Sequence, residues 1–166
     1  MTPSRAIGPL PPHQYVVLAA LVALCLAVGA LGGWTTAQSV TTWYPTLAKP
    51  SFNPPDWVFG PVWTTLYVLM AIAAWLVWRR SGLHGARPAL ILFAVQLALN
   101  LAWSFLFFGA HRVDLALADI VVLWAALVAT AIAFRRHSTM ATVLMLPYLA
   151  WVSFASLLNF SIWRLN

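Results

Sequence analysis

A chain of 166 residues in which 63% are hydrophobic and only 7% are charged has too few polar side chains to cover a soluble domain. With a mean hydropathy of +0.86, lipid must solvate much of its surface, so a soluble enzyme or a soluble binding domain is excluded. Nine basic residues oppose three acidic ones, but they lie between hydrophobic runs. This distribution indicates membrane topology and not nucleic-acid binding.

Five stretches are long and apolar enough to cross a bilayer as helices, which requires about 20 residues each. They are residues 14–33, 57–78, 88–108, 113–134 and 139–160. Because lipid offers no partner to unpaired backbone groups, we expect an all-α membrane protein: a five-transmembrane-helix bundle forming a single domain over 1–166. A cleaved signal peptide is the alternative for the first stretch, although its length favours a retained helix.

Basic residues are unevenly divided between the two sides that five crossings define. Six arginines fall on the N-terminal side, whereas Lys49, Arg112 and Arg164 fall on the other. If the membrane is the plasma membrane of a bacterial envelope, the N-terminus of this multi-pass protein lies inside and the long connector 34–56 lies outside.

Polar side chains recur at helical spacing in two stretches and predict faces that avoid lipid, where polar groups are costly. The third stretch carries Gln96, Asn100 and Trp103, and the fifth carries Tyr148, Trp151, Ala155 and Asn159. In the second stretch Trp63 aligns with Tyr67. Tryptophan more often fills a core or an interfacial belt, so periodicity alone leaves a ligand-binding role open.

Small residues and one carboxylate each allow two interpretations. Ala94, Ala98 and Ala102 form a ridge that lets another helix approach closely, either in a homodimer or within the chain. Asp119 is a functional candidate as an intramembrane carboxylate, but its place near the start of the fourth stretch favours a hydrogen-bonded structural role. The residues show no acid pair, nucleophile or metal-ligand spacing, so no catalytic residue, metal or cofactor is predicted from them.

The long connector begins a series of motifs that runs through all later stretches. These are WYPTLAKPSFNPPDW at 43–57, VWTTLY at 62–67, QLALNLAW at 96–103, ALAD at 116–119, PYLAW at 147–151 and LNF at 158–160. In this order they closely resemble the tryptophan-rich sensory protein and translocator protein family, also called the peripheral benzodiazepine receptor family. The resemblance implies a bundle that commonly dimerises and a pocket that accepts tetrapyrroles such as protoporphyrin IX. In some members it also accepts cholesterol and benzodiazepine-site ligands.

Carried over position by position, the resemblance implies a set of pocket residues in the connector and four helices. They are Trp43, Phe59, Gly60, Val62, Trp63, Asn100, Leu115, Ala118, Trp151, Ala155 and Leu158. Connector 34–56 would be a lid over this pocket, stiffened by its prolines. Aromatic rings would stack on the macrocycle, and Lys49 could meet its propionates.

Three functions are open on this evidence. The first is a membrane-embedded sensor, regulator or translocator that binds porphyrin, as a ligand and not a cofactor, or another hydrophobic small molecule. The alternative is light-dependent porphyrin degradation. The resemblance implies this activity for some bacterial members, in which pocket tryptophans take part, and Trp63 and Trp151 match the positions of those tryptophans. A scaffold that recruits partners through the alanine ridge ranks last, because it leaves the polar faces without a purpose.

Overall fold

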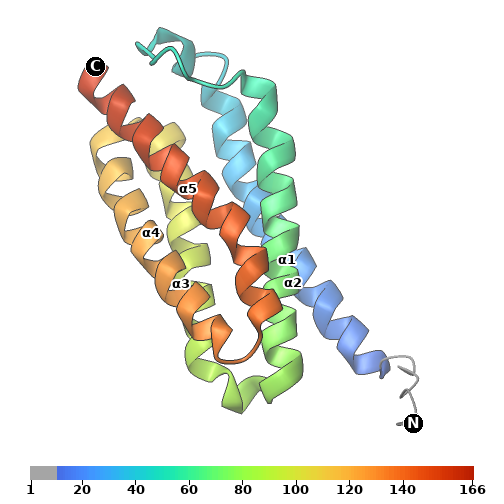
Figure 1. The fold of residues 1–166 in the computed structure, drawn as a ribbon. Helices are drawn as coiled ribbons and strands as arrows, with labels where there is room; N and C mark the ends of the chain where they lie inside the picture. Colours follow the sequence, from blue (N-terminus) through green and yellow to red (C-terminus); the bar gives the residue numbers. More distant parts are fainter. Residues whose placement is uncertain (1–10) are drawn as a thin grey trace, which may run out of the picture.

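A computed structural model describes residues 11–166 and contains five long helices. They are α1 (Pro12–Ser39), α2 (Phe59–Gly85), α3 (Arg87–Ser104), α4 (Val113–Arg135) and α5 (Thr139–Leu165) (Figure 1). Each of the five is long and apolar enough to cross a membrane. The predicted all-α, five-helix fold is confirmed. Arg5, one of the arginines counted for topology, lies outside the described residues.

The helices form a closed ring in the order α1, α2, α5, α4, α3, because α3 returns to contact α1. Short connectors explain the antiparallel pairs α2–α3, α3–α4 and α4–α5. Fully buried Met70, Leu123, Phe134 and Tyr148 fill the centre. Figure 1 shows the connector after α1 and the C-terminal end of α5 at the same end of the bundle. We call this end the connector end.

Helix α1 extends six residues beyond the end that hydropathy predicts. The polar segment 34–39 continues the helix, and its threonine hydroxyls are satisfied within the helix by backbone carbonyls one turn earlier. Thr35 Oγ1 donates to Leu31 O at 3.2 Å and Thr36 Oγ1 donates to Gly32 O at 2.9 Å. The connector therefore begins at Val40 and not at residue 34.

Two irregular turns lie at the ends of α3. At the start, Gly82 near the end of α2 has φ 65°, a left-handed conformation that suits glycine, and it redirects the chain toward α3. At the other end, residues Phe105–Gly109 form a π-helical turn, followed by His111 at φ 55°. Such turns recur at functional sites.

The connector is an ordered structure with two short 3₁₀ turns, Tyr44–Thr46 and Asp56–Val58. Tyr44 OH donates to Asn53 Oδ1 at 2.7 Å. The Asn166 side chain binds both backbone groups of Ala48: its Nδ2 donates to the carbonyl oxygen, and its Oδ1 accepts from the amide, each at 3.0 Å. These bonds hold the connector against the end of α5.

Candidate ligand-binding cavity

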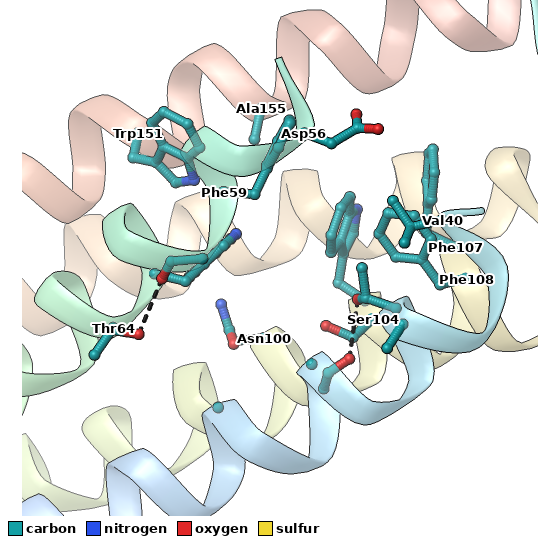
Figure 2. Close-up of a pocket in the computed structure, with 18 of the residues that line it drawn as sticks. Val40, Asp56, Phe59, Thr64, Asn100, Ser104, Phe107, Phe108, Trp151 and Ala155 are labelled. Carbon is teal, nitrogen blue, oxygen red and sulfur yellow. Dashed lines mark hydrogen bonds between the residues drawn. The ribbon is translucent and has the colours of Figure 1, made fainter. Parts of the chain in front are cut away.

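A cavity of about 520 Å³ lies between α1, α2, α3 and α5, beneath the connector. Its volume falls within the range of about 300–1,000 Å³ typical of small-molecule sites. Figure 2 shows Phe59, Trp151 and Ala155 on one side of it, and Phe107 and Phe108 on another. Eight aromatic residues contribute to its lining: Tyr44, Phe59, Trp63, Tyr67, Trp103, Phe107, Phe108 and Trp151.

Helix α1 forms a wall of small residues opposite these aromatic rings. Gly29 and Gly32 also let α1 approach its neighbours closely. A Cβ atom at Gly29 would lie 2.6 Å from the Tyr67 ring, and one at Gly32 would lie 2.9 Å from Ser104 Oγ. A side chain at either position would have to displace the Tyr67 ring or the Ser104 side chain.

Hydrogen bonds between buried side chains join three helices at the floor of the cavity. Tyr67 OH donates to Asn100 Oδ1, and Asn100 Nδ2 donates to Tyr148 OH at 2.8 Å. Asn100 is only 2% exposed and Tyr148 is fully buried. The inward polar faces predicted for α3 and α5 are therefore confirmed.

A second polar chain fixes the Trp103 ring in the cavity wall. Its Nε1 donates to Asn159 Oδ1 at 3.0 Å, and Asn159 Nδ2 donates to Val113 O at 3.0 Å, which joins α3 and α5 to the start of α4. By contrast, Trp151 Nε1 is buried and finds no acceptor among the described residues. The Trp63 and Trp151 rings meet edge to face with centroids 6.5 Å apart.

The connector is attached to the turn between α3 and α4 by an aromatic stack. The Trp43 ring lies 4.1 Å from the His111 ring, centroid to centroid, and 5.7 Å from that of Phe107. Ser39 Oγ donates its one hydrogen to Phe108 O at 2.6 Å. The contact between Ser39 Oγ and His111 Nε2 at 3.1 Å is therefore assigned as a hydrogen bond from Nε2–H to Ser39 Oγ. The connector is thus positioned at the cavity mouth by several independent contacts.

Among the described residues, the lining of the cavity contains one charged side chain, Asp56, at the mouth. Asp56 is the only carboxylate among the lining residues, and no Lys, Arg or His of the described chain lines the cavity. Its charge reaches the wall: burial, followed by the charge of Asp56, raises the pKa of Tyr44 to about 12, against a smaller lowering by the hydrogen bond to Asn53.

Lys49 does not line the cavity, so the expectation that it meets propionates finds no support. Its ammonium group donates to Tyr44 O at 2.7 Å and to Leu47 O at 3.3 Å, and it lies 4.5 Å from the centre of the Tyr44 ring. A lysine that satisfies backbone carbonyls in this way stabilises the connector. Its positive charge lies outside the lining of the cavity.

The structure brings together seven of the pocket residues that the family resemblance implies. They are Phe59, Gly60, Trp63, Asn100, Trp151, Ala155 and Leu158, all in the lining. Trp43 lies outside the lining on His111, and Val62 packs against the central core beside the cavity. Whether these residues contact a ligand stays a prediction.

The remaining two, Leu115 and Ala118, are placed on the outer surface of α4, away from the cavity. Leu115 is 43% exposed, and Ala118 is also exposed. Helix α4 packs on its neighbours through the side that carries Ala116 and Ile120, and the fourth wall of the cavity is α1. Sequence reasoning missed this wall, although the cluster Gly29-x-x-Gly32-Gly33 was a signal for it.

Other candidate residues lie outside the cavity. Ala94 and Ala98 are exposed and Ala102 is partly exposed on the outer face of α3, so a homodimer seam there stays a prediction.

Asp119 is half-buried, and its Oδ2 has no hydrogen-bond partner among the described residues, so the hydrogen bond expected for it is not found at this atom. Trp75 of α2 is 7% exposed, and its Nε1 donates to Gln14 O of α1 at 2.9 Å.

Comparison with known proteins agrees with this architecture. Residues 21–164 match the TspO/MBR family. The chain is 47% identical to tryptophan-rich protein TspO of Chlorobaculum tepidum, over 92% of this chain and 98% of that protein. It is 45% identical to the translocator protein of Homo sapiens, over 75% of each chain. It is 47% identical to the tryptophan-rich sensory protein of Cereibacter sphaeroides, over 75% of this chain and 77% of that one. The chain belongs to the TspO/MBR family of multi-pass integral membrane proteins.

Proposed function

We propose that the cavity binds a tetrapyrrole of the protoporphyrin IX type, and that the protein acts as a membrane sensor, regulator or translocator of this ligand. The observation that carries the proposal is an apolar cavity with eight aromatic residues in its lining beneath an ordered connector. Two relatives, a translocator protein and a tryptophan-rich sensory protein, favour the same role.

The geometry suits a flat, hydrophobic ligand. Aromatic rings offer stacking faces for a macrocycle, and the small residues of α1 leave room for its opposite face. The unpartnered Nε1–H of Trp151 supplies one hydrogen-bond donor. Carboxylates of the ligand would stay at the aqueous mouth, because no basic side chain of the described residues lines the interior.

The cavity is closed toward the opposite end of the bundle, which favours binding and sensing over conduction. Fully buried Met70, Gln96 and Tyr148 lie below its floor. In this conformation, a translocator would have to release its ligand through the mouth of the cavity or laterally between helices.

Binding is tested by quenching of tryptophan fluorescence during titration with protoporphyrin IX in nanodiscs kept in the dark. We expect saturable quenching at micromolar ligand, because a defined cavity holds a fixed number of molecules. Empty nanodiscs and nanodiscs with an unrelated five-helix protein report simple partitioning into lipid. Quenching that never saturates, or that matches the unrelated protein, would refute the proposed site.

A second candidate function is light-dependent oxidation of the bound porphyrin by dioxygen. It is favoured by the edge-to-face contact of Trp63 and Trp151 in the cavity wall, where both indoles would touch the ligand. After illumination of the same samples, a defined new absorbance spectrum in wild type and its absence in a Trp63→Phe, Trp151→Phe variant that still binds would support this reaction. Equal bleaching in both would assign the change to the porphyrin itself.

The Asp56 carboxylate in the lining predicts a charge preference. In Asp56→Asn, we expect the affinity for protoporphyrin IX to rise about 3- to 10-fold, because a partly screened repulsion with the propionates is removed. The neutral dimethyl ester is the matched control and should bind with unchanged affinity. The gain should shrink at high salt. An equal gain for the ester would show that charge is not the cause.

A further inference from the structure

A second hollow lies on the outer surface at the end of the bundle opposite the connector. It is a groove of about 360 Å³, lined by Leu83, His84, Arg87, Leu90, Ile91 and Ala94. Residues 87, 90, 91 and 94 form one face of α3. Gly82, with φ 65°, redirects the chain just before α3, so that Leu83 and His84 complete the groove at its head. The small side chain of Ala94 leaves depth farther along α3.

The groove combines a basic head with an apolar floor. His84 and Arg87 are exposed, whereas Leu90, Ile91 and Ala94 continue along α3 into the membrane-spanning segment. An amphipathic molecule with an acidic head and a hydrocarbon tail matches this arrangement. A purely apolar helix would leave the charge of Arg87 unmatched.

The surrounding charge strengthens this match. The C-terminal ends of α2 and α4, at the same end of the bundle, carry Arg79, Arg80, Arg135 and Arg136. The chain's acidic residues lie elsewhere: Asp56 in the connector, and Asp114 and Asp119 in the part of α4 near the connector end. Among the described residues, this end of the bundle therefore carries no carboxylate.

Unlike Arg79 and Arg80, Arg87 makes no side-chain hydrogen bond, ion pair or cation–π contact with another described residue. Arg79 lies over the Trp75 ring at 4.8 Å, and Arg80 donates to His137 O at 3.4 Å. Within residues 11–166 the one ion pair is Arg112–Asp114, at the connector end. The Arg87 guanidinium is therefore available to a ligand, and its planar fork suits the oxygens of a phosphate.

We propose that this groove binds an anionic phospholipid of the bilayer. The phosphate would contact Arg87 and His84, and an acyl chain would lie along Leu90, Ile91 and Ala94. Basic pockets between transmembrane helices recognise acidic headgroups in this way, and the predicted topology places this end in the leaflet where anionic lipids attract basic residues. The site is independent of the porphyrin cavity.

The test is native mass spectrometry of the detergent-solubilised protein, incubated with phosphatidylglycerol or with phosphatidylcholine of the same acyl chains. We expect wild type to retain phosphatidylglycerol preferentially, and Arg87→Gln to reduce its retention about fivefold. Arg135→Gln, which removes one charge at the same end outside the groove, is the matched control and should change retention little. Equal losses in both variants would show diffuse attraction and overturn the site.

The apolar half of the groove needs a variant that leaves the charge unchanged. Ala94→Phe fills the floor and should also reduce phosphatidylglycerol retention by monomers. If Ala94→Phe alters only the proportion of dimers and not lipid retention, the occupant of this face is a second copy of the chain. Equal retention of the two lipids by wild type would likewise contradict the proposal.

Discussion

Replacing Gly60 with phenylalanine is expected to abolish saturable porphyrin binding while the fold is retained. Gly60 lines the cavity, and no atom lies within 4 Å of the place where its Cβ would be. A larger side chain can therefore enter this open space, but a non-glycine residue before Pro61 is disfavoured in a helical conformation and should lower the unfolding temperature slightly. We expect affinity in the dark titration to fall at least about tenfold while the protein remains folded.

The same substitution at Ala118 is the matched control. The family resemblance implies that Ala118 contacts the ligand, whereas the structure places it on the outer surface of α4. Ala118→Phe should therefore bind porphyrin like wild type. Loss of binding in Ala118→Phe with normal binding in Gly60→Phe would show that the ligand lies against α4 and not in the cavity described above.

Replacing Asn100 with leucine is expected to lower the free energy of unfolding by about 1–3 kcal/mol. The side chain accepts from Tyr67 OH and donates to Tyr148 OH, and both tyrosines are buried. Leucine has a similar volume but leaves both hydroxyls without this partner. Denaturant or thermal unfolding in detergent measures the loss.

A triple variant separates the hydrogen bonds from packing. Adding Tyr67→Phe and Tyr148→Phe to Asn100→Leu removes the hydroxyls that the single variant strands. Because replacing all partners of a polar network is much less costly than removing one, the triple variant should recover most of the lost stability. If it is less stable than Asn100→Leu alone, the shape of these side chains, and not their hydrogen bonding, holds the three helices together.

Much of the fold could be predicted from the sequence because lipid penalises polar groups strongly. Apolar runs of sufficient length predicted five helices, and the spacing of Gln96 and Asn100 predicted which face of α3 is inward. Trp63 and Trp151, whose spacing alone left their role open and which the family resemblance implies as pocket residues, line the cavity.

The remaining features depend on interactions that hydropathy does not record. Segment 34–39 resembled a loop by composition, yet it is helical, and the Thr35 and Thr36 hydroxyls are satisfied by carbonyls one turn earlier. Helix α4 is apolar on nearly every face, so its rotation was not fixed by periodicity, and Leu115, which the family resemblance implies as a pocket residue, lies on the outer surface. The role of Lys49 depended on which oxygen atoms lie nearest, and these proved to belong to the connector itself.

The most direct test of the cavity is the NMR spectrum of the indole N–H groups during titration with protoporphyrin IX. The porphyrin ring current shifts only nuclei close to the macrocycle, and Trp→Phe variants assign each signal. We predict large shifts for Trp63, Trp103 and Trp151, which line the cavity, and none for the exposed Trp34 and Trp124. Shifts confined to exposed tryptophans would contradict binding in the cavity and place the porphyrin on the outer surface.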